Sequence, residues 1–304
     1  MSSMSLSNEG DVPLVNHARG LLRRRVLYVS DLDGTLLGPD SCVSAQSAAM
    51  LNRAIAKGAL FTVATARTPA TVVGLLREVD MRLPAVVMTG AALFDFSDHS
   101  FSRVCLFTSG SVERILSLYR HYRVSTFVYT ISTDRNLLDV YHIGPLNDFE
   151  RSFMSDRCDT PGKTFHVPED GESLLPASLD DTVLLFSVQP WEAARSLYGE
   201  ICASGIPCTP LCYHDAFGPE WAELEIFGPQ TSKAAAVEAI ASDVCADRIV
   251  AFGDNVNDMP LLRLADSGVA VANAIPELRE MADEVIGSNA EDSVPRFILN
   301  HLEI

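Results

Sequence analysis

The chain has 304 residues, 47% of them hydrophobic, and its 23 basic and 40 acidic side chains give a net charge of −17 at neutral pH. This length and composition can bury a sizeable core, which excludes a globally disordered protein. The acidic balance argues against a nucleic-acid or anionic-membrane surface, since both need clustered Lys and Arg. We expect neither kind of partner, and no apolar run approaches the ~18 residues of a membrane span.

The first segment, residues 1–25, contains Ser, Asn and Gly and ends in Arg23-Arg24-Arg25. It lacks the continuous apolar core of a secretory signal. We therefore predict a flexible leader on a cytoplasmic protein. The seven cysteines include no Cys-x-x-Cys pair, which favours reduced thiols over a zinc site.

The next segment, residues 26–35, reads Val-Leu-Tyr-Val-Ser-Asp-Leu-Asp-Gly-Thr. It predicts a strand that ends in Asp31 and Asp33, where Gly34 lets the chain turn. Side chains two residues apart on an extended segment share a face, so we expect both carboxylates to address one small volume. Two carboxylates so near each other repel unless a cation or a shared proton relieves the repulsion, and this indicates a metal site or catalysis. A calcium loop is rejected, because it needs glycine at position six and Glu at position twelve, whereas here the glycine is fourth and Cys42 is twelfth.

Helices and short apolar strands alternate after this segment. The predicted order is helix 44–58, strand 60–64, helix 68–79 and strand 85–88. The first of these strands leads to Thr65, and the second leads to Thr89-Gly90. Strands that alternate with helices of this length indicate βαβ units and a mainly parallel sheet.

Residues 92–228 have a different texture, in which aromatic and β-branched runs alternate with polar loops. We predict an inserted α+β unit there. Within it, Pro161-Gly162-Lys163-Thr164 resembles half of a phosphate-binding P-loop. That match is rejected, because the upstream glycine position is Arg157 and no strand is predicted before it.

The parallel pattern resumes after residue 228, so the large domain is predicted to be discontinuous and to comprise residues 26–91 and 229–304. Thr231-Ser232 cap a helix that begins at Lys233. The remaining strands are predicted at 248–252, 268–271 and 283–286.

Polar side chains gather at or near the ends of these strands, where ligands bind in open α/β sheets. The groups are the carboxylates of Asp31, Asp33, Asp254 and Asp258, the hydroxyl of Thr65 and the ammonium of Lys233. Magnesium-assisted phosphoryl transfer needs such a set, since Mg²⁺ prefers oxygen ligands and phosphate oxygens. A cation in the first turn of a helix opposes the macrodipole, so the position of Lys233 favours a functional role.

Four segments resemble the ordered motifs of the haloacid dehalogenase superfamily: Asp31-Leu32-Asp33-Gly34-Thr35, Thr65, Lys233 and Gly253-Asp254-Asn255-Val256-Asn257-Asp258. The long insert between the second and third motifs resembles the Cof-type phosphatase branch, which carries an α+β cap there. Segments 268–274 and 282–292 are similar to the usual ending of that branch. The resemblance implies an α/β fold, with a Rossmann-like doubly wound parallel sheet and an inserted α+β cap that sets substrate specificity.

The same resemblance implies an Mg²⁺-dependent phosphatase for a small-molecule phosphate ester, with sugar phosphates as the expected class. Asp31 is then the nucleophile that forms an aspartyl-phosphate, and Asp33 is the general acid and base. Thr65 is expected to bond the transferring phosphoryl group, and Lys233 to hold Asp31 and phosphate oxygens.

The resemblance also implies that Mg²⁺ binds Asp31, Asp254 and the backbone carbonyl of Asp33. The supporting or substrate-contacting residues are expected to be Asp258, Asn257, Ala66 and Arg67. The chain departs from the usual family pattern where Ala66 replaces Gly, Thr89 replaces Asn and Ser293 replaces Gly. None of these changes removes a catalytic group.

Two other functions remain open, namely a phosphosugar mutase of related fold and a non-catalytic phospholigand-binding relative. The intact set of acids and Lys233 argues against the second. The sequence indicates neither the physiological substrate nor the oligomeric state.

Overall fold

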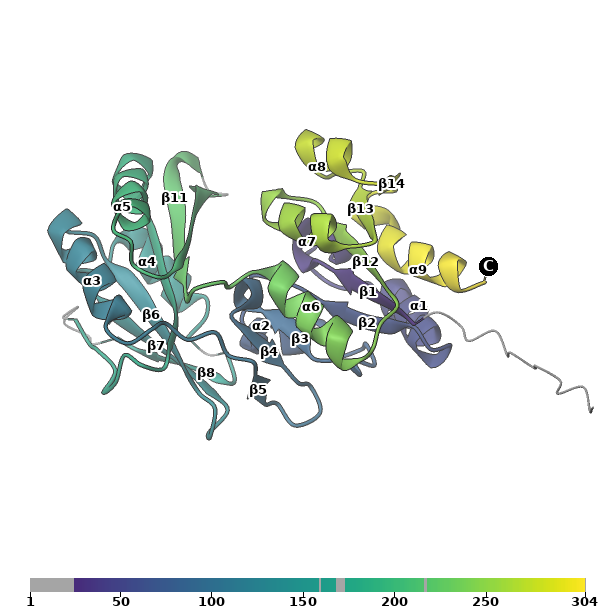
Figure 1. Ribbon diagram of the computed structural model, residues 1–304, viewed down its shortest axis with the longest axis horizontal. Coiled ribbons are helices and arrows are strands. Elements are labelled where there is room, and N and C mark those ends of the chain that lie inside the picture. The colour runs from purple at the N-terminus through teal and green to yellow at the C-terminus, as the bar shows by residue number, and fades with distance from the viewer. Residues whose placement is uncertain (1–24, 159, 168–172, 216–217, 304) are drawn as a thin grey trace, which may run out of the picture.

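The computed structural model describes residues 25–158, 160–167, 173–215 and 218–303, so the predicted leader lies outside the described residues except for its last one. Figure 1 shows two lobes. One lobe is formed by both ends of the described chain and the other by its middle, as an inserted unit requires.

The first lobe is built on a five-stranded sheet of order β14-β13-β12-β1-β2, with every pairing parallel. Its strands are β1 Val26–Ser30, β2 Leu60–Val63, β12 Arg248–Gly253, β13 Ser267–Val271 and β14 Glu284–Ile286. The chain runs from β1 to β2 on one side and returns through β12 on the other. The carboxyl end of β1 therefore lies at a topological switch point, where a crevice for ligands forms.

Helices flank this sheet in two packed pairs (Figure 1). The pairs are α1 Ala45–Ala56 with α9 Ser293–Glu303, and α6 Lys233–Asp243 with α7 Met259–Leu264. Ser44 caps α1 by accepting a hydrogen bond from the backbone N–H of Ser47, as its position before the apolar stripe suggests. The shorter α2 Pro69–Leu75 and α8 Pro276–Met281 complete the lobe. The predicted α/β core with an inserted α+β unit is confirmed.

The helix predicted to reach Val79 is shorter than expected, because α2 ends at Leu75. Gly74 lies in its last turn and lowers helix propensity there. Val79 is nonetheless buried. The apolar residues that led to the longer predicted helix thus lie partly in a buried turn after α2.

A small three-stranded sheet follows, of order β3-β4-β5. Its strands are β3 Ala85–Val87, β4 Ala92–Phe94 and β5 Phe101–Ser102, all paired antiparallel. A parallel bridge between Ala64 and Val86 aligns β3 with the main sheet, as expected for a third strand. Strands β4 and β5 fall within residues 92–228 but pair with β3, and the exact limits of the inserted domain stay a prediction.

The second lobe has a six-stranded sheet of order β10-β11-β9-β6-β7-β8. The strands are β6 Thr126–Ser132, β7 Leu137–Ile143, β8 Lys163–His166, β9 Thr182–Pro190, β10 Thr209–Asp215 and β11 Gly218–Phe227. Helices α3 Ser111–Tyr122 and α5 Trp191–Ala203 pack together in one cluster with Leu185 and Leu224. The alternate residues Phe186 and Phe227 belong to the cluster that continues into the first lobe. Because side chains alternate along a strand, one face of the sheet packs on these helices and the other faces the first lobe.

The connection between β7 and β8 contains the short helix α4 Asp148–Ser155. Its cap residue Asn147 and Glu150 form a capping box, in which each side chain bonds the backbone of the other. In the parts of the chain that the structure describes, no helix has both the length and the apolar content needed to cross a membrane.

Candidate active site

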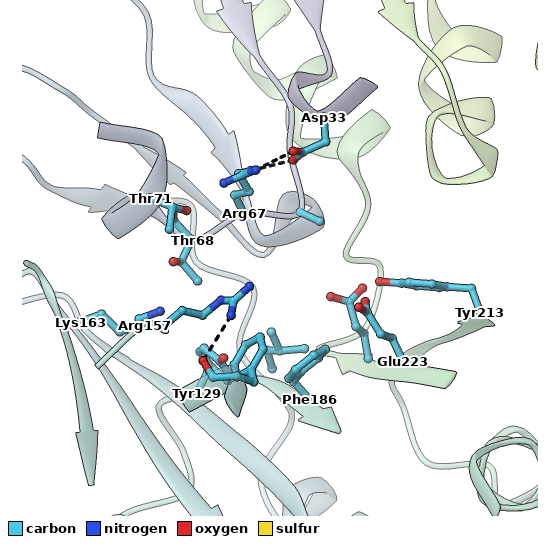
Figure 2. Close-up of a pocket in the computed structure, with 14 residues that line it drawn as sticks. Asp33, Arg67, Thr68, Thr71, Tyr129, Arg157, Lys163, Phe186, Tyr213 and Glu223 are labelled. Atoms are coloured by element: carbon cyan, nitrogen blue, oxygen red, sulfur yellow. Dashed lines mark hydrogen bonds and ion pairs between the residues drawn. The ribbon is translucent and has the colours of Figure 1, made fainter. Parts of the chain in front are cut away.

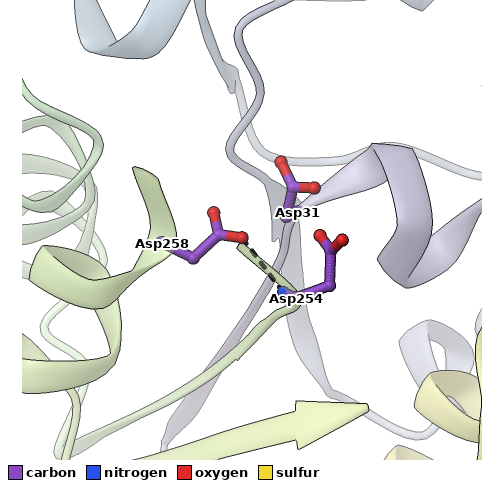
Figure 3. Close-up of side chains that lie close together, drawn as sticks. All are labelled: Asp31, Asp254 and Asp258. Carbon is purple, nitrogen blue, oxygen red and sulfur yellow. Dashed lines mark hydrogen bonds between the residues drawn. The ribbon is translucent and has the colours of Figure 1, made fainter. Parts of the chain in front are cut away.

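Three carboxylates meet at the carboxyl ends of two paired strands (Figure 3). Asp31 follows β1, Asp254 follows β12, and Asp258 ends the short helix η3 Val256–Asp258. Each of the three offers an oxygen within 4.8 Å of the others. The parallel pairing of β1 with β12 therefore brings together acids that are more than 200 residues apart in sequence.

The ammonium group of Lys233 joins two of these acids. Its Nζ donates to Asp31 Oδ1 at 2.6 Å and to Asp258 Oδ1 at 2.8 Å, and all three residues are buried. The buried carboxylates Asp258 and Asp31 raise the pKa of Lys233, although burial opposes them. Burial, and then the neighbouring Asp258, raise the pKa of Asp31 to about 8, against the opposing effect of Lys233. A single ammonium thus stays charged but does not neutralise the acids around it.

Asp254 is the part-buried member of this cluster. Thr35 Oγ1 donates to its Oδ1 at 3.0 Å. Burial raises the pKa of Asp254 to about 6, with Asp258 as the second cause. Gly34 lies directly beside this carboxylate, since a Cβ added there would collide with Asp254 Oδ2.

This donor set suits a hard divalent cation such as Mg²⁺. The atoms that could bind a metal are all carboxylate oxygens. The three carboxyl groups can together carry more negative charge than the one positive charge of Lys233 neutralises. Asp258 also accepts hydrogen bonds at Oδ2 from the backbone N–H groups of Asp254 and Asn255, at 3.1 and 3.2 Å. Both Asp258 oxygens are therefore occupied, which leaves Asp31 and Asp254 as the better placed metal ligands. Asn257 lies on η3 with an exposed side chain.

Asp33 takes a different direction from Asp31. Its carboxylate is exposed and forms a bidentate ion pair with Arg67, with Nε to Oδ2 at 2.7 Å and Nη2 to Oδ1 at 2.6 Å. The acidic cluster found among the described residues comprises Asp31, Asp254 and Asp258, and it does not include Asp33. The sharing of one small volume by the Asp31 and Asp33 carboxylates stays a prediction, as does metal contact through the Asp33 backbone.

Thr65 is buried where the chain leaves β2. Its Oγ1 accepts from the backbone N–H of Arg67 at 3.1 Å, and its carbonyl accepts from the N–H of Thr89 at 3.0 Å. These bonds set the turn that carries Arg67 toward Asp33. Ala66, at the same turn, is exposed and lines the cavity described next.

A cavity of about 340 Å³ lies between the two lobes (Figure 2). The first lobe contributes Asp33, Ala66, Arg67, Thr68 and Thr71. The second lobe contributes Tyr129, Phe153, Arg157, Lys163, Leu184, Phe186, Tyr213, Glu223 and Glu225. The face of the inserted sheet opposite α3 and α5, on which Phe153 of α4 packs against Phe186, thus lies across the cavity from Asp33.

None of the residues of this cap wall was predicted from the sequence to line a site. Glu223 and Glu225 alternate on β11 with Leu224, which is the i, i+2 pattern that drew attention to Asp31 and Asp33. Burial raises the pKa of Glu225 to about 7, and the hydroxyl of Tyr213 donates to this carboxylate. The spacing of Glu223 and Glu225, two residues apart on one face of a strand, is the sequence pattern from which this part of the wall could have been predicted.

A parallel core sheet with carboxylates at its strand ends, and an inserted unit across a cavity from them, defines the class of capped Rossmann-like α/β proteins with a ligand site between core and cap. A family model described as haloacid dehalogenase-like hydrolase matches residues 28–298. The chain therefore belongs to the haloacid dehalogenase-like hydrolases, and its resemblance to the Cof-type branch is confirmed.

Several relatives of the chain are named phosphatases. It is 25% identical over 288 residues to YitU of Bacillus subtilis, a 5-amino-6-(5-phospho-D-ribitylamino)uracil phosphatase. The alignment covers 91% of this chain and 98% of that protein. It is 22% identical over 278 residues to YbhA of Escherichia coli, a pyridoxal phosphate phosphatase. The alignment covers 90% of this chain and 97% of that protein.

Solved structures show the same fold. A phosphatase of the superfamily from Bacteroides thetaiotaomicron superposes with a TM-score of 0.69 at 22% identity, over 97% of this chain and 99% of that one. A sugar phosphatase of subclass IIB superposes with a TM-score of 0.67 at 19% identity, over 92% of this chain and 100% of that one.

Proposed function

We propose that this protein is an Mg²⁺-dependent phosphomonoesterase that hydrolyses small phosphorylated metabolites, sugar phosphates among them, through an aspartyl-phosphate on Asp31. The observation that carries the proposal is the buried Asp31 carboxylate, held by Lys233 and crowded by Asp254 and Asp258 at the covered end of the sheet. The relatives named above, which act on phosphorylated small molecules, support it.

Asp31 acts as the nucleophile in this mechanism. Lys233 engages Oδ1 and so orients the carboxylate, while Oδ2 attacks phosphorus and displaces the alcohol. A bound Mg²⁺ would neutralise charge on the phosphate and on the Asp31 and Asp254 carboxylates. Lys233 adds a buried positive charge that stabilises the negative charge of the transition state.

Asp33 carries the protons. It protonates the oxygen of the leaving alcohol and then accepts a proton from the water that hydrolyses the aspartyl-phosphate. Its exposed carboxylate lines the cavity in which the leaving group would lie. Arg67 forms an ion pair with Asp33 in the structure. When that ion pair opens, Arg67 can bind the substrate phosphate.

The cavity limits the size of the substrate. A volume of about 340 Å³ lies at the lower end for small-molecule sites. A leaving group of a few carbons with polar substituents suits this space, whereas a macromolecular phosphate does not. Closure of the cap face over the acids also keeps water from competing with the alcohol.

The test is phosphate release from a panel of phosphorylated metabolites, with and without MgCl₂, by the natural chain and by Asp31→Asn. We expect release that needs Mg²⁺ and that falls to background in the variant. Analysis of the sugar products distinguishes the mutase, which would yield an isomerised sugar phosphate without free phosphate. Full activity of Asp31→Asn would overturn the proposal.

A further inference from the structure

Two cations lie next to each other on the cap wall of the cavity. Arg157 follows α4, and Lys163 is the first residue of β8. Both line the cavity, and Lys163 is only 5% exposed. Figure 2 shows both side chains on the opposite side of the cavity from Glu223 and Tyr213.

The partners of these cations within the described residues are neutral. The guanidinium of Arg157 lies 4.1 Å from the ring centroid of Phe153 and donates to the carbonyl of that residue at 3.2 Å. The ammonium of Lys163 lies 5.0 Å from the ring centroid of Phe165. Among the ion pairs that the structure records for the described residues, none includes either cation.

This arrangement is unusual in so acidic a chain, where 40 acidic side chains face 23 basic ones. Burial lowers the pKa of Lys163 to about 8, with the charge of Arg157 as the second cause. A buried cation beside a second cation costs stability unless an anion compensates the two. A pair of cations in a cavity, with no compensating anion among the residues that the structure describes, indicates a binding function.

The cavity extends from the cations Arg157 and Lys163 to the proposed general acid Asp33. Asp33 and Arg67 line the same space as Arg157 and Lys163, so one small ligand can reach both. The opposite side of the cavity carries the carboxyl groups of Glu223 and Glu225, which offer an anion no positive charge. They are suited to accept hydrogen bonds from hydroxyl or amino groups instead.

We propose that the substrate carries, besides the phosphate that is cleaved, a second anionic group, and that Arg157 and Lys163 of the cap bind this group. The proposal rests on the phosphatase function proposed above and narrows its substrates to doubly anionic metabolites. The second group is a carboxylate or a phosphate at the end of the leaving group distant from Asp31. Guanidinium and ammonium groups bind both by charge-assisted hydrogen bonds.

Two matched substrate pairs test the proposal. The first is 6-phosphogluconate against glucitol 6-phosphate, which differ by a carboxylate in place of a hydroxymethyl group. The second is fructose 1,6-bisphosphate against fructose 6-phosphate. In at least one pair, we expect kcat/KM for phosphate release to be roughly tenfold or more higher for the doubly anionic member. The pair that shows the preference identifies the second group as carboxylate or phosphate.

Variants assign that preference to the two cations. The double variant Arg157→Met with Lys163→Met should lose the preference, because its kcat/KM falls roughly tenfold further for the doubly anionic members than for the singly anionic ones. A cooperative thermal unfolding transition reports that the double variant folds. Arg157→Lys should keep part of the preference. Arg114→Met, a change of an exposed arginine on α3, should keep all of it. Equal turnover within both pairs by the natural chain, or a preference that survives in the double variant, would overturn the proposal.

A binding measurement separates this proposal from the proposed function. Titration calorimetry with Asp31→Asn and MgCl₂ compares the dissociation constants of the same substrates without turnover. Tighter binding of a doubly anionic member, lost when Arg157 and Lys163 are also changed to Met, supports the anion site even if no substrate is hydrolysed. Equal dissociation constants within both pairs contradict it, whereas absence of hydrolysis alone contradicts only the phosphatase.

Discussion

Arg67 holds both carboxylate oxygens of Asp33, at 2.6 and 2.7 Å, at the edge of the cavity. A carboxylate that accepts two hydrogen bonds from a guanidinium has to release one of them before it can carry a proton. The ion pair therefore describes the resting site, and we expect a bound phosphate to draw Arg67 away from Asp33. This exchange would couple the arrival of substrate to the readiness of the general acid.

Replacement of the general acid should affect substrates according to their leaving groups. Asp33→Asn is expected to slow hydrolysis of an alkyl phosphate by roughly 10²–10⁴, because the alcohol then departs without a proton. An aryl phosphate such as p-nitrophenyl phosphate, whose leaving group needs no protonation, should be slowed much less in its first step. Burst kinetics with both substrates check this. Equal losses in the bond-cleaving step would show that Asp33 is not the acid.

Gly34 tests the metal site through its close approach to Asp254. An alanine there would place its Cβ against the Asp254 carboxylate, so we expect Gly34→Ala to raise the Mg²⁺ concentration needed for half-maximal activity. Gly58→Ala is the matched control, because Gly58 also has positive φ, +98°, but has no neighbouring atom within 4 Å.

Both glycine variants should lose about 1–2 kcal/mol of stability from the left-handed backbone. Only Gly34→Ala should shift the Mg²⁺ dependence. The comparison uses thermal unfolding together with Mg²⁺ titrations of phosphate release. Identical Mg²⁺ curves for the two variants would argue against Asp254 as a metal ligand.

Lys233 should stabilise the fold as well as the reaction. Lys233→Met removes the cation that pairs Asp31 and Asp258, and we expect a loss of about 3–5 kcal/mol in the free energy of unfolding. Adding Asp31→Asn to this variant should restore part of the loss when unfolding is measured above pH 8, where Asp31 without Lys233 would otherwise carry an unpaired buried charge or have to bind a proton. Urea unfolding of both single variants and the double variant measures the coupling. Strictly additive effects would contradict the paired arrangement.

The carboxyl group of Glu225 predicts a dependence of stability on pH. Burial raises its pKa from 4.5 to about 7, so between these values the folded chain binds more protons than the unfolded chain. Its contribution to stability is therefore complete below about pH 4.5 and is lost as the pH rises through 7.

Glu225→Gln should flatten the decline in the free energy of unfolding between pH 5 and 7 by up to about 1.4 kcal/mol per pH unit. Urea unfolding in excess MgCl₂ measures both slopes. Glu238→Gln, which removes an exposed carboxyl on α6, controls for the change in net charge. Equal slopes for the natural chain and Glu225→Gln would show that Glu225 is ionised across this range.

The first lobe was the more predictable part of the molecule. Asp31 and Asp254 follow apolar strands, and Ser232 caps the helix that begins at Lys233, so local signals place each group at one edge of a parallel sheet. The rules of parallel βαβ connection then bring these groups together. The cation pair of the cap depends on distant contacts instead. The order β10-β11-β9-β6-β7-β8, which exposes Arg157 and Lys163 to the other lobe, follows no local signal.

Thr89 shows a further limit of motif reading. The superfamily branch usually has Asn at this position, and the structure places Thr89 at φ of +57°, a conformation that suits Asn far better than a β-branched residue. Its hydroxyl is buried without a hydrogen-bond partner among the described residues. The departure seen in the sequence is thus a site of local strain beside Thr65, which the motif alone did not reveal.

The central claim is the covalent intermediate on Asp31, and trapping that intermediate tests it most directly. The enzyme is mixed with substrate and MgCl₂, quenched, reduced with borohydride and digested, and the peptide that contains Asp31 is analysed by mass spectrometry. We predict reduction of the acyl-phosphate at position 31 to homoserine, only when substrate is present. An active enzyme in which Asp31 is never reduced, or in which another carboxylate is reduced instead, would contradict the account.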